Sequence, residues 1–400
     1  MAGTVSAGTA YVVLPGDIDD PATPSGGNHY DRQVITGLTG LGWRVRELAV
    51  PGSWPRPAEA GRVALAAALA GVPDGAVVLL DGLVACGVPE VVGPAAVRLR
   101  VAVLVHLPLG DETGLPPEVA ARLDEWERQT LRAAPAIVAT SAGTGRRLVE
   151  RHGLPAARVH IVPPGVAAAP LASGTDGAAS LLCVASVIPR KGHDVLVEAL
   201  ATIPDRPWTC HCVGPVDRDP GHLDRLRRLA GAAGLADRIR FVGPRTGTEL
   251  AADYAAADLL VLASRSEPYG MVVTEALARG IPVLGSAVDG LPEAVGRTPD
   301  GAVPGLLVPP GDPAALAGAL RRWFDEPELR HRLRAAAQDR RADLPGWKVT
   351  AARLGEVLSA LARQPGLPRR PAPAGDAPSS PTGDAPSPRA GDDPWEGAQT

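Results

Sequence analysis

The chain has 400 residues, of which 45% are hydrophobic and 21% charged, so it has enough apolar residues for the cores of about two domains. Its net charge of -4 argues against a nucleic acid partner, and its apolar runs are shorter than the roughly 20 residues of a membrane-spanning helix. No charged-then-apolar leader opens the chain. We therefore expect a cytoplasmic protein, with a peripheral membrane contact as an open alternative.

Residues 1–168 are predicted to form the first domain. The continuous apolar runs "AYVVLPG", "AVVLLDG", "VAVLVHLP", "AIVATS" and "RVHIVPPGV" alternate there with helical stretches such as "YDRQVITGLTGLGW". Continuous apolar runs are typical of strands that are buried on both faces of a parallel sheet. The alternation therefore predicts a doubly wound α/β domain.

A Pro/Ala/Gly/Ser-rich linker at 169–179 leads into a second predicted domain of the same kind at 180–345. Its apolar runs are "LLCVASV", "TCHCVG", "IRFVGP", "DLLVLASRS", "PVLGSAV" and "GLLVPPG". Ligands of doubly wound sheets bind outside the carboxyl ends of the strands. We therefore expect two domains that face each other across a central cleft, where a ligand binds.

The end of the chain divides into a helix and a tail. "WKVTAARLGEVLSALAR" has helical spacing, and we expect a helix at 346–363 that packs back toward the first domain. Residues 364–400 are rich in Pro, Gly, Ala, Ser and Asp, and "GDAPS" occurs twice among them. Such a composition buries too little apolar surface to fold, so this tail is predicted to be disordered.

The stretch "SEPYGMVVTEALARGIPV" is predicted to place two carboxylates beside the start of a helix. Glu267 would lie in the loop that follows a strand, and Glu275 about one turn inside the helix. Four unpaired backbone N–H groups would point into the same space, those of Tyr269, Gly270, Met271 and Val272. Such N–H groups bind phosphate, whereas carboxylates accept hydrogen bonds from sugar hydroxyls. A nucleotide sugar carries both kinds of group.

The stretch "SVIPRKGHD" places two cations at the end of the second domain's first predicted strand. Arg190 and Lys191 precede Gly192 and a helix start, and the chain has only one other lysine, Lys348. Arginine binds planar oxyanions with a fork of donors, and lysine supplies a compact charge. The turn is therefore a candidate phosphate site, with a solvated basic turn as the alternative.

Together these motifs resemble the family 4 retaining glycosyltransferases of the GT-B fold. The chain has the "PRKG" turn and the E-x(7)-E motif in the form "EPYGMVVTEALARGIPV", followed by "VDGLPEAV" and "GLLVPPGDPAALAGAL". The resemblance covers most of residues 10–362. It implies two doubly wound, Rossmann-like domains around a central cleft, with the acceptor side in the first and the donor nucleotide sugar in the second.

The resemblance also implies roles for residues of the second domain. Glu275 would bind the ribose hydroxyls of the donor nucleotide, and Glu267 the hydroxyls of the donor sugar. Arg190 and Lys191 would face the diphosphate, together with the four N–H groups. Ser186, also expected among the donor-binding residues, stands where many family members have an arginine. One phosphate contact is thereby removed, and either Arg190 compensates for it or the donor binds less tightly.

In the first domain, "PSGGNHY" resembles the family's Gly-Gly loop. Gly26 and Gly27 would therefore let the backbone approach the donor phosphates. His106 ends "VAVLVH" and matches the histidine that contacts the donor sugar near the reacting carbon, although a lone histidine after an apolar run is more often structural. The residues expected to be catalytic are His106, Lys191, Arg190 and Glu267.

The implied activity is the transfer of a hexosyl unit from a UDP- or GDP-sugar to a hydroxyl of a small molecule, a glycan or a lipid. Transfer on the same face would need neither a cofactor nor a metal, because cations and N–H groups stabilise the charge on the leaving diphosphate. One alternative is a nicotinamide-dependent dehydrogenase, but no G-x-G-x-x-G follows the first strand. The other is a noncatalytic protein that binds sugars or nucleotides. Export would be expected of such a protein, and the sequence shows no leader for it.

Two stretches carry residue types that bind metals. Cys210 and Cys212 share one face of a predicted strand, but a metal site needs further ligands, so we interpret them as small core residues. Asp17, Asp19 and Asp20 could hold a metal, but we interpret this stretch as a solvated or acceptor-facing loop. We therefore expect no metal site.

Overall fold

The structure is a computed structural model. It describes residues 8–20, 25–112, 114–175 and 177–364. The tail that is predicted to be disordered lies outside these residues, apart from Gln364. Within the described ranges, no helix combines the length and the apolar character that crossing a membrane requires.

The first half of the chain forms a parallel sheet with the strand order β2-β1-β3-β4-β5-β6. The strands are β1 (Thr9–Pro15), β2 (Arg44–Val50), β3 (Val77–Asp81), β4 (Arg100–Val105), β5 (Ala136–Ala139) and β6 (Val159–Ile161). All except β2 coincide with the apolar runs of the sequence, and β3 is buried along its whole length. β2 was not predicted, because this edge strand mixes charged and apolar residues and is largely exposed.

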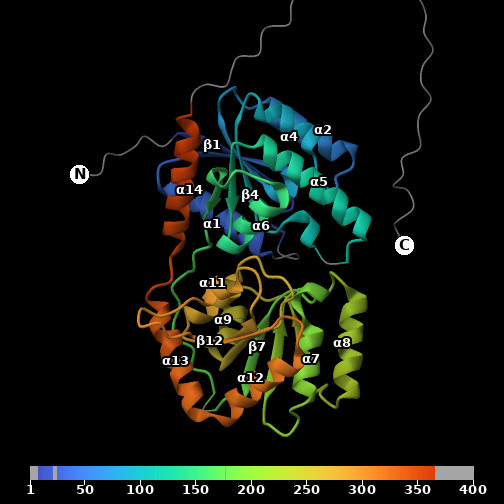
Figure 1. The fold of residues 1–400 in the computed structure, drawn as a ribbon, viewed down its shortest axis with the longest axis vertical. Helices are drawn as coiled ribbons and strands as arrows, with labels where there is room; N and C mark the ends of the chain where they lie inside the picture. The colour runs from blue at the N-terminus through green and yellow to red at the C-terminus, as the bar shows by residue number, and fades with distance from the viewer. Residues whose placement is uncertain (1–7, 21–24, 113, 176, 365–400) are drawn as a thin grey trace, which may run out of the picture. The chain divides into compact units, whose positions relative to one another are not determined.

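Helices cover both faces of this sheet (Figure 1). They are α1 (Gly26–Gly40), α2 (Glu59–Ala70), α3 (Gly82–Ala85), α4 (Pro89–Ala96), α5 (Pro117–Ala133) and α6 (Ala142–His152). Successive residues of a strand point to opposite faces. Accordingly, Val12 packs into the apolar cluster that contains α1, and Val13 into the cluster that contains α2, α4 and α5. The two clusters explain why a continuous apolar strand is stable here.

The second half repeats this plan with the strand order β12-β11-β10-β7-β8-β9. Its strands are β7 (Ser180–Val184), β8 (Thr209–Val213), β9 (Ile239–Gly243), β10 (Leu259–Leu262), β11 (Val283–Ser286) and β12 (Gly305–Val308). Its helices are α7 (His193–Ala201), α8 (Pro220–Ala232), α9 (Gly247–Ala255), α10 (Met271–Leu277), α11 (Leu291–Val295), α12 (Pro313–Asp325) and α13 (Pro327–Arg341). The two parallel six-stranded sheets confirm the predicted fold class of two doubly wound domains.

The last described helix, α14 (Trp347–Ala362), packs against α1 of the first half. Gly37 of α1 faces Ala351, and a Cβ on residue 37 would overlap the Ala351 methyl group. The hydroxyl of Thr350 donates a hydrogen bond to the carbonyl oxygen of Pro163 over 3.0 Å. The chain therefore returns to the first sheet after it has completed the second.

Candidate functional site

The two glutamates of the E-x(7)-E motif lie in the loop that follows β10 and in α10. Glu267 lies in the loop and is 7% exposed, and Glu275 lies in α10 one turn from its start. Gly270 precedes α10 with a φ of +94°, which a residue with a Cβ rarely adopts. The chain turns sharply here, and Met271 and Val272 are half-buried as the first residues of the helix.

Lys191 and Glu267 form an ion pair. Nζ of Lys191 lies 2.5 Å from Oε2 of Glu267, and the two side chains are 16% and 9% exposed. The hydroxyl of Ser264 donates to the same carboxylate oxygen over 3.3 Å. The structure thus brings two predicted site residues, one from the "PRKG" turn and one from the glutamate loop, into direct contact.

The turn that carries Arg190 and Lys191 is locked against the end of β10. It is a single 3₁₀ turn that ends at Gly192, whose φ is +66°. A Cβ on Gly192 would overlap the carbonyl oxygen of Ala263. Nη1 of Arg190 donates to the carbonyl oxygen of Ser266 over 3.2 Å. The turn can approach the loop this closely only because residue 192 has no side chain.

Arg190 is already engaged by protein groups on a second side. Its Nε lies 3.6 Å from Oε1 of Glu112. Ser186, where many family members have an arginine, is half-buried in the loop between β7 and the turn. Tyr269, whose N–H was expected to bind phosphate, is buried next to Gly270.

Tyr254 of α9 orients the second glutamate of the motif. Its hydroxyl donates to Oε2 of Glu275 over 2.8 Å, and the guanidinium of Arg279 lies over the Tyr254 ring at 4.5 Å. Burial raises the pKa of Glu275, and the Tyr254 hydrogen bond and the charges of His29 and Arg279 oppose part of that rise. Tyr254 was not predicted as a site residue, because no sequence motif links it to Glu275.

The N-terminus of α1 carries the predicted Gly-Gly loop. Ser25 caps the helix with its side chain. A Cβ on Gly26 would lie 3.7 Å from Sδ of Met271, and a Cβ on Gly27 would lie 3.2 Å from Cδ2 of His106. The two glycines therefore lie beside two other predicted site residues, one from α10 and one from the end of β4.

His106 contacts carboxyl groups that the sequence analysis missed. Its Nε2 lies 3.0 Å from Oδ1 of Asp31 in α1, and Asp81 ends β3, the strand beside β4. Burial lowers the pKa of His106, but the charge and hydrogen bond of Asp31 and the charge of Asp81 outweigh burial and raise it. A carboxylate at the end of the apolar run "VVLLD" was the available signal for Asp81.

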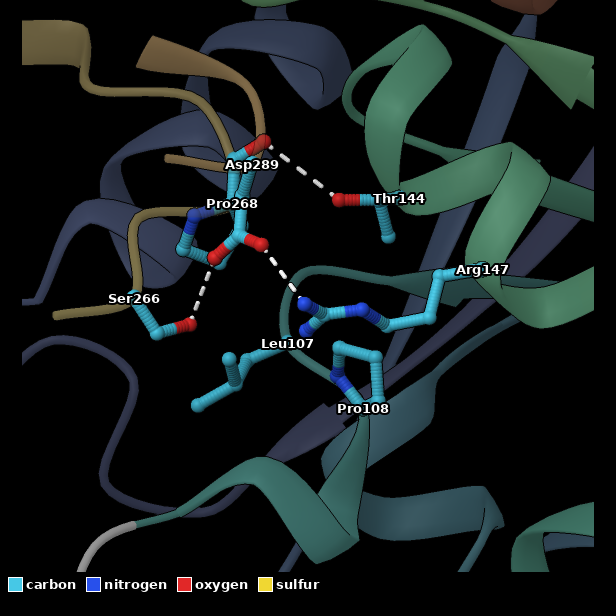
Figure 2. A pocket seen from close by; sticks show the side chains of 7 residues that line it. All are labelled: Leu107, Pro108, Thr144, Arg147, Ser266, Pro268 and Asp289. Carbon is cyan, nitrogen blue, oxygen red and sulfur yellow. Dashed lines mark hydrogen bonds and ion pairs between the residues drawn. The ribbon is translucent and has the colours of Figure 1, made fainter. Parts of the chain in front are cut away.

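A small pocket lies beside the glutamate loop (Figure 2). It is lined by Leu107, Pro108, Thr144, Arg147, Ser266, Pro268 and Asp289. Nη2 of Arg147 lies 2.6 Å from Oδ1 of Asp289. The Ser266 hydroxyl and the backbone N–H of Glu267 donate to Oδ2 of Asp289 over 2.7 and 2.9 Å. Asp289, from the "VDGLPEAV" segment, therefore holds the loop that carries Glu267, a role that sequence reasoning missed.

Metal-binding residue types also meet in the core of the second half. Sγ of Cys183 lies 3.7 Å from Nε2 of His193, and Cys212 is the neighbour of Cys183 across β7 and β8. Three ligands are one fewer than a structural zinc site takes, and we interpret the cysteines as core residues. In the acidic loop after β1, Asp19 pairs with Arg32 at 2.5 Å.

Two protein-family models match the chain. The model described as "Glycosyl transferases group 1" matches residues 174–340, and the one described as "Glycosyltransferase Family 4" matches residues 89–169. The chain is 36% identical over 267 residues to D-inositol 3-phosphate glycosyltransferase of Kineococcus radiotolerans, a match over 61% of each chain. It is 37% identical over 265 residues to the protein of that name in Streptomyces scabiei, over 61% of this chain and 58% of the relative. The chain therefore spans about three fifths of these relatives' length.

Solved structures with a similar fold cover almost nine tenths of the chain. Sucrose-phosphate synthase from Thermosynechococcus elongatus has a TM-score of 0.72 at 24% identity, over 89% of this chain and 99% of that chain. Anabaena HepE in complex with UDP and glucose has a TM-score of 0.67 at 18% identity, over 88% of this chain and 99% of that chain. At these identities the similarity shows a shared fold of two doubly wound domains.

Proposed function

We propose that this chain, which belongs to the family 4 glycosyltransferases of the GT-B fold, transfers a hexosyl unit from a nucleotide diphosphate sugar to an acceptor hydroxyl with retention of configuration. The contact of Lys191 with Glu267 at the carboxyl ends of β7 and β10 carries this proposal. This edge of a doubly wound sheet is where ligands bind. In this proposal, residues 180–345 bind the donor, and residues 1–168 form the acceptor side.

Each of the two glutamates would bind one sugar of the donor, the ribose or the transferred hexose. Glu275, oriented by Tyr254, would accept hydrogen bonds from the ribose hydroxyls, and Glu267 from the hydroxyls of the transferred sugar. Lys191 and Arg190 would face the diphosphate between them. The solved Anabaena protein with bound UDP-glucose supports a UDP-sugar as the donor, and a GDP-sugar is the alternative.

The reaction would break the bond between the anomeric carbon and the diphosphate oxygen, whose electron pair leaves with the diphosphate. Lys191 and Arg190 would stabilise the growing negative charge. The acceptor oxygen would then bond to the anomeric carbon on the same face, and its proton would pass to the leaving phosphate oxygen. His106 would contact the transferred sugar near the reacting carbon. These steps balance without a protein nucleophile, a metal or a cofactor.

The acceptor is proposed only as a hydroxyl compound. The name D-inositol 3-phosphate glycosyltransferase, carried by the relatives, supports a small polyol acceptor. A glycan and a lipid are the alternatives.

The proposal is tested by incubating the full chain with UDP- and GDP-sugars and measuring release of the nucleotide diphosphate, with and without acceptors. The acceptor panel should include D-inositol 3-phosphate, a neutral polyol, an oligosaccharide and a glycolipid. We expect one donor–acceptor pair to accelerate release, a product with the donor's anomeric configuration by NMR, and full activity with EDTA. An inverted product would contradict retention. Binding of the nucleotide sugar without release of the nucleotide diphosphate would favour the noncatalytic alternative. Thermal stabilisation of the protein by NAD would favour the dehydrogenase.

Replacing Glu275 with glutamine should weaken binding of the donor's nucleotide diphosphate about 10- to 100-fold. The reason is the loss of charged hydrogen bonds to the ribose hydroxyls, worth about 1.5–3 kcal/mol. Isothermal titration calorimetry measures this effect without an acceptor. Tyr254→Phe should weaken binding less, because it removes only the hydroxyl that orients Glu275. Glu249→Gln, at an exposed position of α9, is the control. Unchanged affinity in Glu275→Gln would remove this residue from the proposed site.

A further inference from the structure

We infer that Asp31 and Asp81 form a buried proton relay with His106 that holds its imidazole ring in place and positively charged beside the donor sugar. Asp31 is the positioning residue, and Asp81 carries the proton that the two carboxyl groups share. The inference rests on the proposed function, because His106 is the group expected to contact the sugar.

The three side chains come from three elements that meet at one edge of the first sheet. His106 follows β4, Asp81 ends the neighbouring β3, and Asp31 lies in α1. Asp31 and Asp81 are 2% and 4% exposed, and the His106 side chain is 20% exposed. The hydrogen bond between His106 and Asp31 is therefore shielded from water, while part of the ring is accessible. The ring also lies against Gly27, at the loop where the donor phosphates are expected.

The second oxygen of Asp31 is where we infer the shared proton to lie. Oδ1 is hydrogen-bonded to His106, but Oδ2 is buried and has no hydrogen-bond donor among the described residues. A protonated Asp81 can supply the missing donor, because ligand atoms of Asp31, Asp81 and His106 all lie within 4.8 Å of one another. Two buried carboxylates in contact do not both ionise readily. One proton between them therefore satisfies Oδ2 and leaves one negative charge to face the imidazole.

The titration of Asp81 agrees with this arrangement. Burial, followed by the charge of Asp31, raises the pKa of Asp81 to about 7, while the charge of His106 and the N–H of Leu83 oppose part of that rise. Asp81 is therefore protonated below neutral pH and ionised above it. Ionisation adds a second negative charge beside the imidazolium, which keeps the ring charged as the pH rises.

The other titratable groups around the relay stay neutral. The Tyr30 ring meets the His106 ring edge-on at 5.2 Å, and burial raises the pKa of its phenol. Cys86 lies near Asp81, and burial raises the pKa of its thiol. The charged groups that face His106 are therefore Asp31 and Asp81 among the described residues.

The relay is tested by NMR titration of His106 in the protein without donor, with His106→Gln used to assign its signal. In Asp31→Asn we expect the His106 pKa to fall below that of the wild type, because the ring loses its negatively charged partner. We also expect kcat/KM to fall about 10- to 100-fold, the effect of one charged hydrogen bond. The decline of activity at high pH should begin at a lower pH. The titration needs no activity, so it separates failure of the relay from failure of the proposed function.

Asp81→Asn provides a second variant that mimics the protonated acid. Below about pH 6 it should match the wild type, and above neutral pH its His106 should lose its charge earlier. Should Asp31→Asn fail to fold, this comparison decides the question.

The matched control is Glu127→Gln, which alters a second buried histidine–carboxylate pair in the described part of the chain. Oε2 of Glu127 lies 3.0 Å from Nε2 of His152, in a pair that contains no predicted site residue. The pH profile of activity in Glu127→Gln should match that of the wild type, even if the melting temperature of this variant falls. Three results would overturn the inference: an unchanged His106 pKa in Asp31→Asn, an equal shift of the profile in Glu127→Gln, or a stoichiometric metal that Asp31→Asn loses.

Discussion

Replacing Lys191 with glutamine is expected to lower kcat about 10²- to 10³-fold and to change KM for the donor much less. This is the typical effect of removing one preorganised group that stabilises developing charge. The contribution of Lys191 should grow as the bond to the diphosphate breaks, so the loss appears in kcat. The chain has Ser186 where many family members have an arginine, and Arg190 is engaged by Ser266 and Glu112. The site should therefore depend strongly on this lysine.

Glutamine is the preferred replacement because Glu267 is nearly buried. An alanine would leave that carboxylate without its 2.5 Å partner, and the removal of one member of a buried pair can destabilise the fold. The control is Lys348→Gln, at the chain's other lysine, which is exposed on α14. Steady-state kinetics on folded protein measure both variants. A near-normal kcat in Lys191→Gln would show that the lysine serves only to neutralise Glu267.

Replacing Gly192 with alanine is expected to destabilise the protein by about 3 kcal/mol and to reduce transfer activity. The left-handed conformation of Gly192 accounts for about 1–2 kcal/mol, and the overlap of the new methyl group with the carbonyl oxygen of Ala263 adds the rest. For a domain of this size the melting temperature should fall by about 6–12 °C. Activity should fall as well, because the turn that shifts carries Lys191.

Gly311→Ala is the matched control for this change. Gly311 has a φ of +70°, close to that of Gly192, but a Cβ there meets no atom within 4 Å. This variant should lose only about 1–2 kcal/mol, the effect of the conformation itself. Thermal unfolding followed by circular dichroism compares the two. Equal losses would mean that the turn moves away from β10 without strain, and the close approach would then not be needed.

The sequence determined most of the strands, because burial on both faces leaves a continuous apolar run. All strands of the second sheet and all but β2 of the first were predicted in this way. The exception is informative. β2 lies at the sheet edge with charged residues along its exposed side, so its pairing with β1 supplies stability that its composition does not reveal.

The glutamate loop and the "PRKG" turn were also predictable, since each has a local signature. Gly270 and Gly192 permit left-handed backbone, and the charged residues lie within a few positions of them. What the sequence could not determine is which charges meet. Lys191 and Glu267 are 76 positions apart in the chain, and no local rule relates them. The parallel order of β7 and β10 brings their carboxyl ends to one edge and so creates the pair.

The same reason explains the residues that the sequence analysis missed. In the sequence, Asp31 looks like an ordinary helix residue and Asp81 like a strand end. The packing of α1 over the first sheet brings Asp31 to His106, and the pairing of β3 with β4 brings Asp81 there. Asp289 likewise holds the glutamate loop only because the turn after β11 lies beside the end of β10. The sequence by itself determined the element types and the local motifs, because these depend on neighbouring residues. The tertiary structure decided the partners of each charge, because these depend on strand order and on how closely the backbone approaches itself.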